Sequence, residues 1–116
     1  MIIDTIEITV AAANYDKESQ ILAGALREIE AMVHGKDDFV IGEPQYTFGW
    51  YFFTVYVSRD LMVKLMNLLG TEFLAVKGKS FEKKFVNWLN TRLKQLGCGV
   101  HLNLKSEMET TKFGLF

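Results

Sequence analysis

The segment from Trp50 to Val57 limits the possible folds more than any other part of the chain. Every residue in it is aromatic or β-branched, which is typical of a strand near the centre of a sheet. Side chains alternate between the two faces of a strand. If the strand is continuous, one face carries Tyr46, Phe48, Trp50, Phe52 and Tyr56, and the other carries Tyr51, Phe53, Val55 and Val57.

Three further segments have the pattern of strands. Apolar and polar residues alternate between Ile2 and Ala12, which predicts a half-buried strand. Residues 39–41 are apolar and open a second strand region, and Val100 to Lys105 alternate as a last strand before a short tail to Phe116. Gly42, Pro44 and Gly49 leave the position of the hairpin open, either near Glu43-Pro44 or near Gly49.

Helical spacing of apolar residues marks the remaining segments. Apolar residues recur at this spacing from Ile21 to Val33, and they predict a helix that is capped by Asn14 or Asp16 and ends at Gly35. A second helix follows the potential cap Ser58 and ends at Gly70, and a third runs from Phe81 to Leu96. Between them, residues 73–76 have the composition of a short strand.

This order predicts an α+β fold with a ferredoxin-like β-α-β-β-α-β frame. The frame has an antiparallel sheet with helices on one face, and here an extra helical segment precedes the last strand. The 116 residues suit one domain, residues 1–116, with a core that needs neither disulfides nor metal ions.

The composition excludes several classes of protein. A single cysteine forms no internal disulfide, and there is no cluster of cysteine and histidine with the spacing of a zinc site. No apolar run reaches the roughly 18–20 residues that cross a bilayer, and no signal peptide is evident, so we expect a cytoplasmic protein without membrane contact. Motifs for nucleotide binding, serine hydrolysis and zinc proteolysis are absent from the sequence, and we expect no cofactor and no metal ion.

The aromatic face is the strongest indication of function. A ferredoxin-like sheet has helices on only one face, so the other face needs a second subunit, a ligand or the C-terminal elements to cover its aromatic residues. Of these, a second copy of the chain is the leading hypothesis. Tyr46, Phe48, Trp50, Phe52 and Tyr56 are therefore the candidate interface or stacking residues.

A ligand that stacks on this face is the alternative. The segment from Phe48 to Phe53 partly resembles the RNP1 strand of RNA-recognition motifs, in which aromatic side chains stack on unpaired bases. The resemblance covers about six residues and implies a single-stranded nucleic acid as ligand. The sequence departs from that pattern in two places: Tyr46-Thr47 replaces the basic residue and glycine, and residues 6–9 contain no aromatic side chain.

Charge is distributed unevenly along the chain, although the net charge is only -1. Residues 1–60 hold four basic and ten acidic side chains, a net charge of -6, and residues 61–116 hold nine basic and four acidic, a net charge of +5. The basic surface candidates gather on and just before the last predicted helix: Lys77, Lys79, Lys83, Lys84 and Lys94. They fit either a solvated helix face or a row of phosphate contacts.

Single reactive residues give weaker signals. His101 could act as a base in a small enzyme, but no partner nucleophile is recognisable. Cys98 follows a helix C-terminus, which disfavours a thiolate. Asp37, Asp38 and Glu43 are more consistent with a hydrated turn than with a cation site.

The sequence therefore predicts a small non-enzymatic interaction protein, such as an inhibitor or immunity-type binder, that acts on a protein target and forms a homodimer. A nucleic-acid-binding protein is the second hypothesis, and a small enzyme using His101 is the third.

Overall fold

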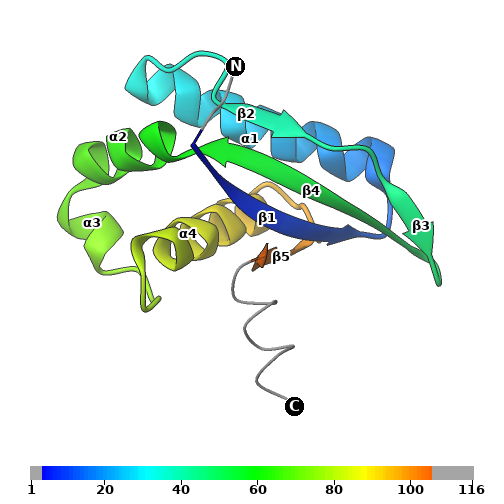
Figure 1. Ribbon diagram of the computed structural model, residues 1–116. Coiled ribbons are helices and arrows are strands. Elements are labelled where there is room, and N and C mark those ends of the chain that lie inside the picture. Colours follow the sequence, from blue (N-terminus) through cyan, green and yellow to red (C-terminus); the bar gives the residue numbers. More distant parts are fainter. Residues whose placement is uncertain (1–3, 106–116) are drawn as a thin grey trace.

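The central element of the structure is a long strand, β4, with partners on both sides (Figure 1). The computed structural model describes residues 4–105. In that range the chain forms a five-stranded antiparallel sheet in the order β2-β4-β1-β5, and β3 also pairs with β4. The elements are β1 (Thr5–Ala12), α1 (Tyr15–Val33), β2 (Phe39–Ile41), β3 (Gln45–Thr47), β4 (Trp50–Ser58), α2 (Arg59–Leu69), α3 (Thr71–Leu74), α4 (Phe81–Gln95) and β5 (His101–Leu104).

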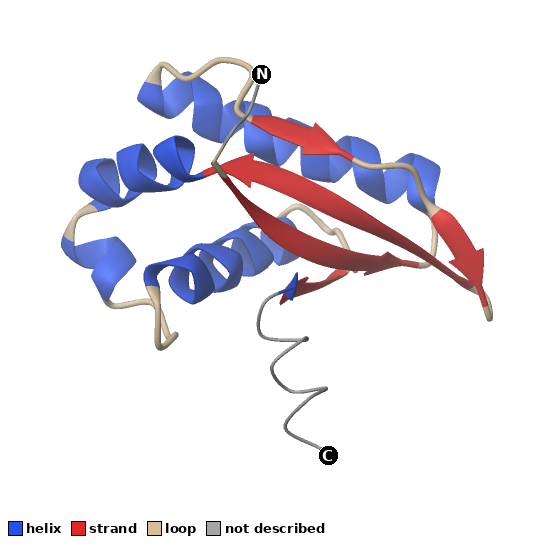
Figure 2. Ribbon diagram, viewed as in Figure 1, coloured by secondary structure: helices blue, strands red, loops and turns tan. Residues whose placement is uncertain are grey.

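The helices lie on one side of the sheet, as Figure 2 shows. The burial pattern agrees, because β1 alternates strictly between partly exposed and buried residues along its length. Ile8, Val10 and Val55 of the sheet are buried against Leu26 of α1 and Leu89 of α4 in one apolar core. The prediction of a compact α+β architecture is confirmed, and so are the expected helical segments between β4 and the last strand.

Each long helix begins at a polar side chain that accepts a backbone hydrogen bond. Asn14 caps α1 through the amide of Lys17, Ser58 caps α2 through that of Asp60, and Ser80 caps α4 through that of Lys83. The cap satisfies an amide that the first helical turn leaves unpaired. All three caps were expected from the sequence, which left Asn14 and Asp16 as alternatives for the first helix, and in the structure the cap is Asn14.

The hairpin turns at Phe48-Gly49, the second of the two positions that the sequence left open. Both residues have positive φ, 52° and 85°, as a two-residue type I′ turn requires. Upstream, residues 42–44 face only residues 53 and 54 of β4, because Ile41 pairs with Val55 and Gln45 pairs with Phe52. Three residues therefore face two, and the one in excess makes a β-bulge that separates β2 from β3 along the same edge of β4.

One predicted element is wrong in type. Residues 73–76 were expected to form a short strand, but Thr71–Leu74 forms the helical turn α3. Phe73 is fully buried among the helices, and no strand of the described range lies beside this segment. An apolar run of this length does not distinguish a strand from a buried helical turn.

No helix within residues 4–105 has the length and apolar character needed to cross a membrane.

Candidate interaction surfaces

The side of the sheet without helices carries a row of partly exposed apolar side chains, which we name the sheet-face patch. It consists of Val40 on β2 and Trp50, Phe52 and Tyr56 on β4. Val40 is 52% exposed, Trp50 38% and Phe52 41%, and Tyr56 is partly exposed. Their neighbours on β4, Phe53, Val55 and Val57, are buried on the helix side. The alternation predicted for Trp50 to Val57 is therefore what the structure has.

Two of the five candidate aromatic residues lie elsewhere. Tyr46 is directly opposite Tyr51, with ring centroids 4.8 Å apart, and Tyr51 in turn lies 6.3 Å from Tyr15 of α1. Tyr46 is thus on the helix side, and its assignment to the other face is wrong. The two-residue turn reverses the chain between β3 and β4, so a continuous alternation from Tyr46 to Tyr56 does not exist.

Phe48 is also not on a sheet face. It is the first residue of the turn and is 96% exposed, so its ring projects from the tip of the hairpin.

The surroundings of the sheet-face patch are mostly uncharged. The imidazole of His101 lies 5.8 Å from the Trp50 indole, centroid to centroid. In the middle of the sheet, Thr9 pairs with Thr54 on one side and with Asn103 on the other. Glu7 forms an ion pair of 3.7 Å with Lys105, so these two opposite charges are matched within the chain.

The predicted basic surface is on the other side of the domain. Phe85, Leu89 and Leu93 of α4 are buried in the core, so the polar face of this helix points away from the sheet. Lys77 and Lys79 are exposed in the loop before α4, Lys83 is partly exposed, and Lys94 is exposed near the helix end. The sheet and the helix layer therefore separate these lysines from the sheet-face patch.

Lys84 has a structural role in this group. Its ammonium group donates hydrogen bonds to the carbonyl oxygens of Leu74 (2.9 Å) and Val76 (2.6 Å). Asn87 of α4 donates in the same way to the carbonyl of Lys77 (2.7 Å). These contacts satisfy carbonyl groups at and after the end of α3 and hold the following loop against α4.

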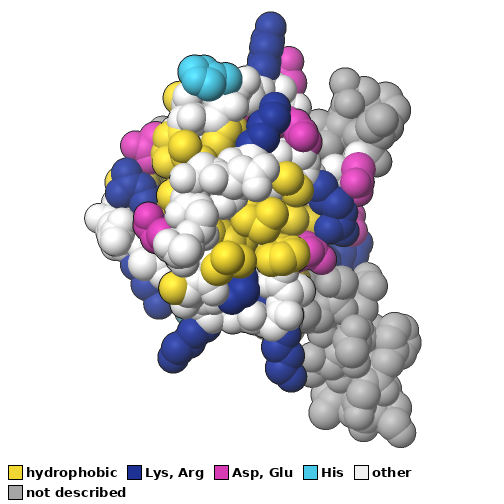
Figure 3. All heavy atoms as spheres, turned by 90° about the vertical axis from the view of Figure 1, so that its left-hand side faces the viewer, with side chains coloured by type: hydrophobic (Ala, Val, Ile, Leu, Met, Phe, Trp, Pro, Cys, Tyr) yellow, Lys and Arg dark blue, Asp and Glu magenta, His cyan; other side chains and the backbone are white. Residues whose placement is uncertain are grey.

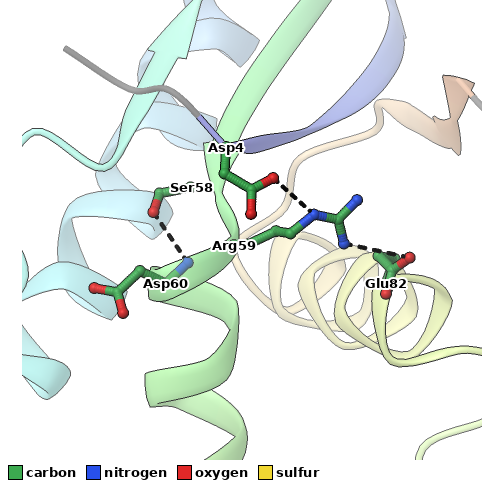
Figure 4. Close-up of polar contacts among 5 residues, drawn as sticks. All are labelled: Asp4, Ser58, Arg59, Asp60 and Glu82. Atoms are coloured by element: carbon green, nitrogen blue, oxygen red, sulfur yellow. Dashed lines mark hydrogen bonds and ion pairs between the residues drawn. The ribbon is translucent and has the colours of Figure 1, made fainter.

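Arg92 and Arg59 each connect separate elements. Arg92 pairs with Glu28 of α1 at 3.0 Å and is partly exposed. Figure 4 shows Arg59, at the start of α2, between Asp4 (3.0 Å) and Glu82 of α4 (3.5 Å). Since its guanidinium already has two carboxylate partners, Arg59 is not available as an anion site.

A second apolar surface was not foreseen from the sequence. Figure 3 shows hydrophobic side chains gathered on the side of the molecule that carries α2 and α3. The exposed apolar residues of the three helices at this side, which we name the helix-side patch, are Val63, Leu68, Leu74 and Phe81. Leu68 and Phe81 fit the helical spacing of apolar residues, yet they are 54% and 48% exposed. Spacing alone does not reveal how far a helix extends past the layer that it covers.

Within residues 4–105 the reactive residues that the sequence singles out have different environments. Cys98 is 3% exposed, and burial raises the pKa of its thiol, with the nearby carboxylate of Glu18 acting in the same direction. The carboxylate of Asp38 accepts a hydrogen bond from the amide of Lys36, and no group of three potential metal ligands comes together within the described residues. The imidazole of His101 lies against the Trp50 ring.

Comparison of the chain with protein-family models, with curated proteins and with solved structures finds no match in any of the three.

Proposed function

We propose that this chain is a non-enzymatic interaction protein that forms a homodimer through the sheet-face patch. The observation that carries the proposal is the row of half-exposed Val40, Trp50 and Phe52 beside Tyr56 on the face without helices. Half-exposed apolar side chains on one face are characteristic of contact sites, where aromatic residues are enriched, and here Thr54 lies between Phe52 and Tyr56 on that face.

The size of the face is consistent with a weak dimer. The five strands hold 27 residues, and at about 3.3 Å along a strand and about 4.8 Å between strands they cover about 430 Å². Two copies would then bury roughly 860 Å² together, which is the size of a weak, reversible interface. Few charges would be buried, since Glu7 and Lys105 already neutralise each other.

The strand order also supports the finer description of the fold as ferredoxin-like. If β2 and β3 are counted as one interrupted edge strand, the elements follow the β-α-β-β-α-β scheme with β1 and β4 in the centre. In such a fold the face opposite the helices is the natural contact surface. An inhibitor or immunity-type role, in which the dimer occludes a site on a protein target, belongs to the same proposal.

Binding of single-stranded nucleic acid is supported less well. Trp50, Phe52 and His101 present rings on the sheet face, as stacking would require. Phosphate groups of a strand on that face would, however, meet the Glu7–Lys105 ion pair rather than the lysines on and before α4, which lie on the other side of the helix layer.

Light scattering over a range of protein concentrations tests the proposal. We expect the average mass to rise toward twice the chain mass as the concentration increases. A mass that stays at one chain at every concentration would contradict a dimer.

A further inference from the structure

The free edge of β2 presents backbone groups that have no strand beside them in the described range. The amide of Ser58 donates to the carbonyl of Asp38 (2.7 Å), and the amide of Gly42 donates to Thr54 (2.8 Å). In an antiparallel pair, hydrogen-bonded residues alternate, so residues 38, 40 and 42 face β4. The N–H and C=O groups of Phe39 and Ile41 therefore point away from β4.

A groove of about 490 Å³ runs beside this edge, between β2 and α1. Its lining residues are Tyr15, Ser19, Gln20, Ala23 and Arg27 of α1 and Ile41 of β2. Four of the helix residues are spaced by four, from Tyr15 to Arg27, so they follow one line about 18 Å long. That length matches about five residues of extended chain.

Arg27 supplies an uncompensated positive charge in the groove. It is exposed, and it forms no ion pair with another residue of the range 4–105. Two carboxylates close to it on α1 are already engaged, because Glu28 pairs with Arg92 and Glu30 accepts the amide of Asp38. Within residues 4–105 Arg27 therefore stays available for a carboxylate of another molecule.

We propose that this groove binds an extended, acidic segment of a protein partner, which adds to β2 as a further strand. Its backbone pairs with Phe39 and Ile41, and one of its carboxylate side chains pairs with Arg27. Backbone pairing gives affinity in this mode of recognition, and side-chain contacts give selectivity. The site is independent of the proposed dimer, since the groove opens between α1 and the sheet edge and not on the sheet-face patch.

The sequence around β2 limits the added strand to a short length. The bulge at residues 42–44 interrupts the edge before β3, and Pro44 has no N–H group to donate. A Cβ atom on Gly42 would lie 2.9 Å from the carbonyl oxygen of Thr54, so only glycine fits where the edge ends. The free edge thus accepts a short segment and does not invite continued edge-to-edge association.

The test uses a displayed library of random heptapeptides as the probe and compares two variants at one position. Ile41→Pro removes an N–H group that points outward and breaks no bond to β4, whereas Ile41→Ala shortens the side chain and keeps the N–H group. We expect selected peptides to be enriched in Asp or Glu. They should bind Ile41→Pro at least about tenfold more weakly than Ile41→Ala, the factor that corresponds to one lost hydrogen bond. Arg27→Ala should weaken the binding of the acidic peptides, and peptides selected on this variant should not be enriched in Asp or Glu.

Amide hydrogen exchange on the unmodified protein gives a second readout, which does not depend on the folding of any variant. A bound peptide should slow exchange at Phe39 and Ile41. The proposal is overturned if no selected peptide protects these two amides, or if the peptides bind folded Ile41→Pro as tightly as Ile41→Ala.

Discussion

The indole of Trp50 and the imidazole of His101 approach to 5.8 Å across β1, although they belong to strands that do not pair with each other. The residue of β1 in register with His101 is Ala11, which is also opposite Phe52. Because Ala11 is small, rings from the strands on both sides can approach over it. The aromatic surface therefore extends across three strands of the sheet and is not confined to β4.

Trp50 should become shielded from solvent when the protein dimerises. In a Trp88→Phe background Trp50 is the remaining tryptophan, because the chain has two. We expect its quenching by acrylamide to fall as the protein concentration rises, since the dimer would cover a ring that is now 38% exposed. The reciprocal Trp50→Phe variant is the control, because Trp88 lies against the core on the helix side and its quenching should not change with concentration. Unchanged quenching of Trp50 would exclude it from the interface.

Phe48 should be replaceable with a gain in stability. Its φ of 52° is costly for a residue with a large side chain, and its ring, 96% exposed, packs against little. Phe48→Asn should raise the free energy of unfolding by about 0.5–1 kcal/mol, because asparagine adopts this backbone region readily. Phe48→Val should lower it by about 1 kcal/mol, since a β-branched residue is strained there. Urea denaturation measures both, and equal stabilities would show that the turn conformation is not under this constraint.

Lys84 should stabilise the segment after α3. Its ammonium group binds two carbonyl oxygens, and hydrogen bonds from charged groups contribute more than neutral ones. Lys84→Met should reduce stability by about 1–2 kcal/mol, a value lowered to allow for partial exposure. Lys79→Met in the exposed loop is the matched control, with an expected change within about 0.5 kcal/mol. If the two variants unfold at the same urea concentration, the contact contributes nothing measurable.

Cys98 should react slowly in the folded protein. Burial raises the pKa of its thiol above the ordinary 9.0, so little thiolate is present near neutral pH. Alkylation by iodoacetamide should be much faster in urea than in buffer. Rapid labelling of the native protein would contradict the buried position of the sulfur atom.

The same shift predicts a pH dependence of stability. The folded protein holds the Cys98 proton more tightly than the unfolded chain does, so this stabilising contribution is complete below the unfolded-state pKa. It is lost as the pH rises from the ordinary value of 9.0 through the higher pKa of the folded state. Between pH 8 and 10 the wild type should therefore lose more unfolding free energy than Cys98→Ala, and parallel curves would disprove the shift.

Local signals in the sequence predicted much of the fold. The alternation in β1 and the caps Asn14, Ser58 and Ser80 depend on residues close in sequence, and the structure has all of them as expected. The face of Tyr46 depends on where the chain reverses, and Pro44 and Gly49 are both good turn residues.

The helix-side patch and the groove at β2 depend on long-range packing. Leu68 fits the apolar spacing of α2, but only the position of α2 at the end of the helix layer leaves it exposed. Similarly, β2 forms one wall of the groove because α1 runs along the edge of the sheet. No sequence pattern in β2 or in α1 indicates that the two elements lie side by side.

The most direct measurement is sedimentation velocity on a pair of variants that place the same charge on opposite sides of the domain. Phe52→Lys changes the sheet-face patch and Leu68→Lys changes the helix-side patch, and both residues are exposed enough, at 41% and 54%, for the chain to fold. We expect Phe52→Lys to remain a monomer at concentrations where the wild type and Leu68→Lys form dimers, because a lysine in the interface would be buried without a partner. Dimers of Phe52→Lys as stable as those of the wild type would contradict the sheet face as the contact surface.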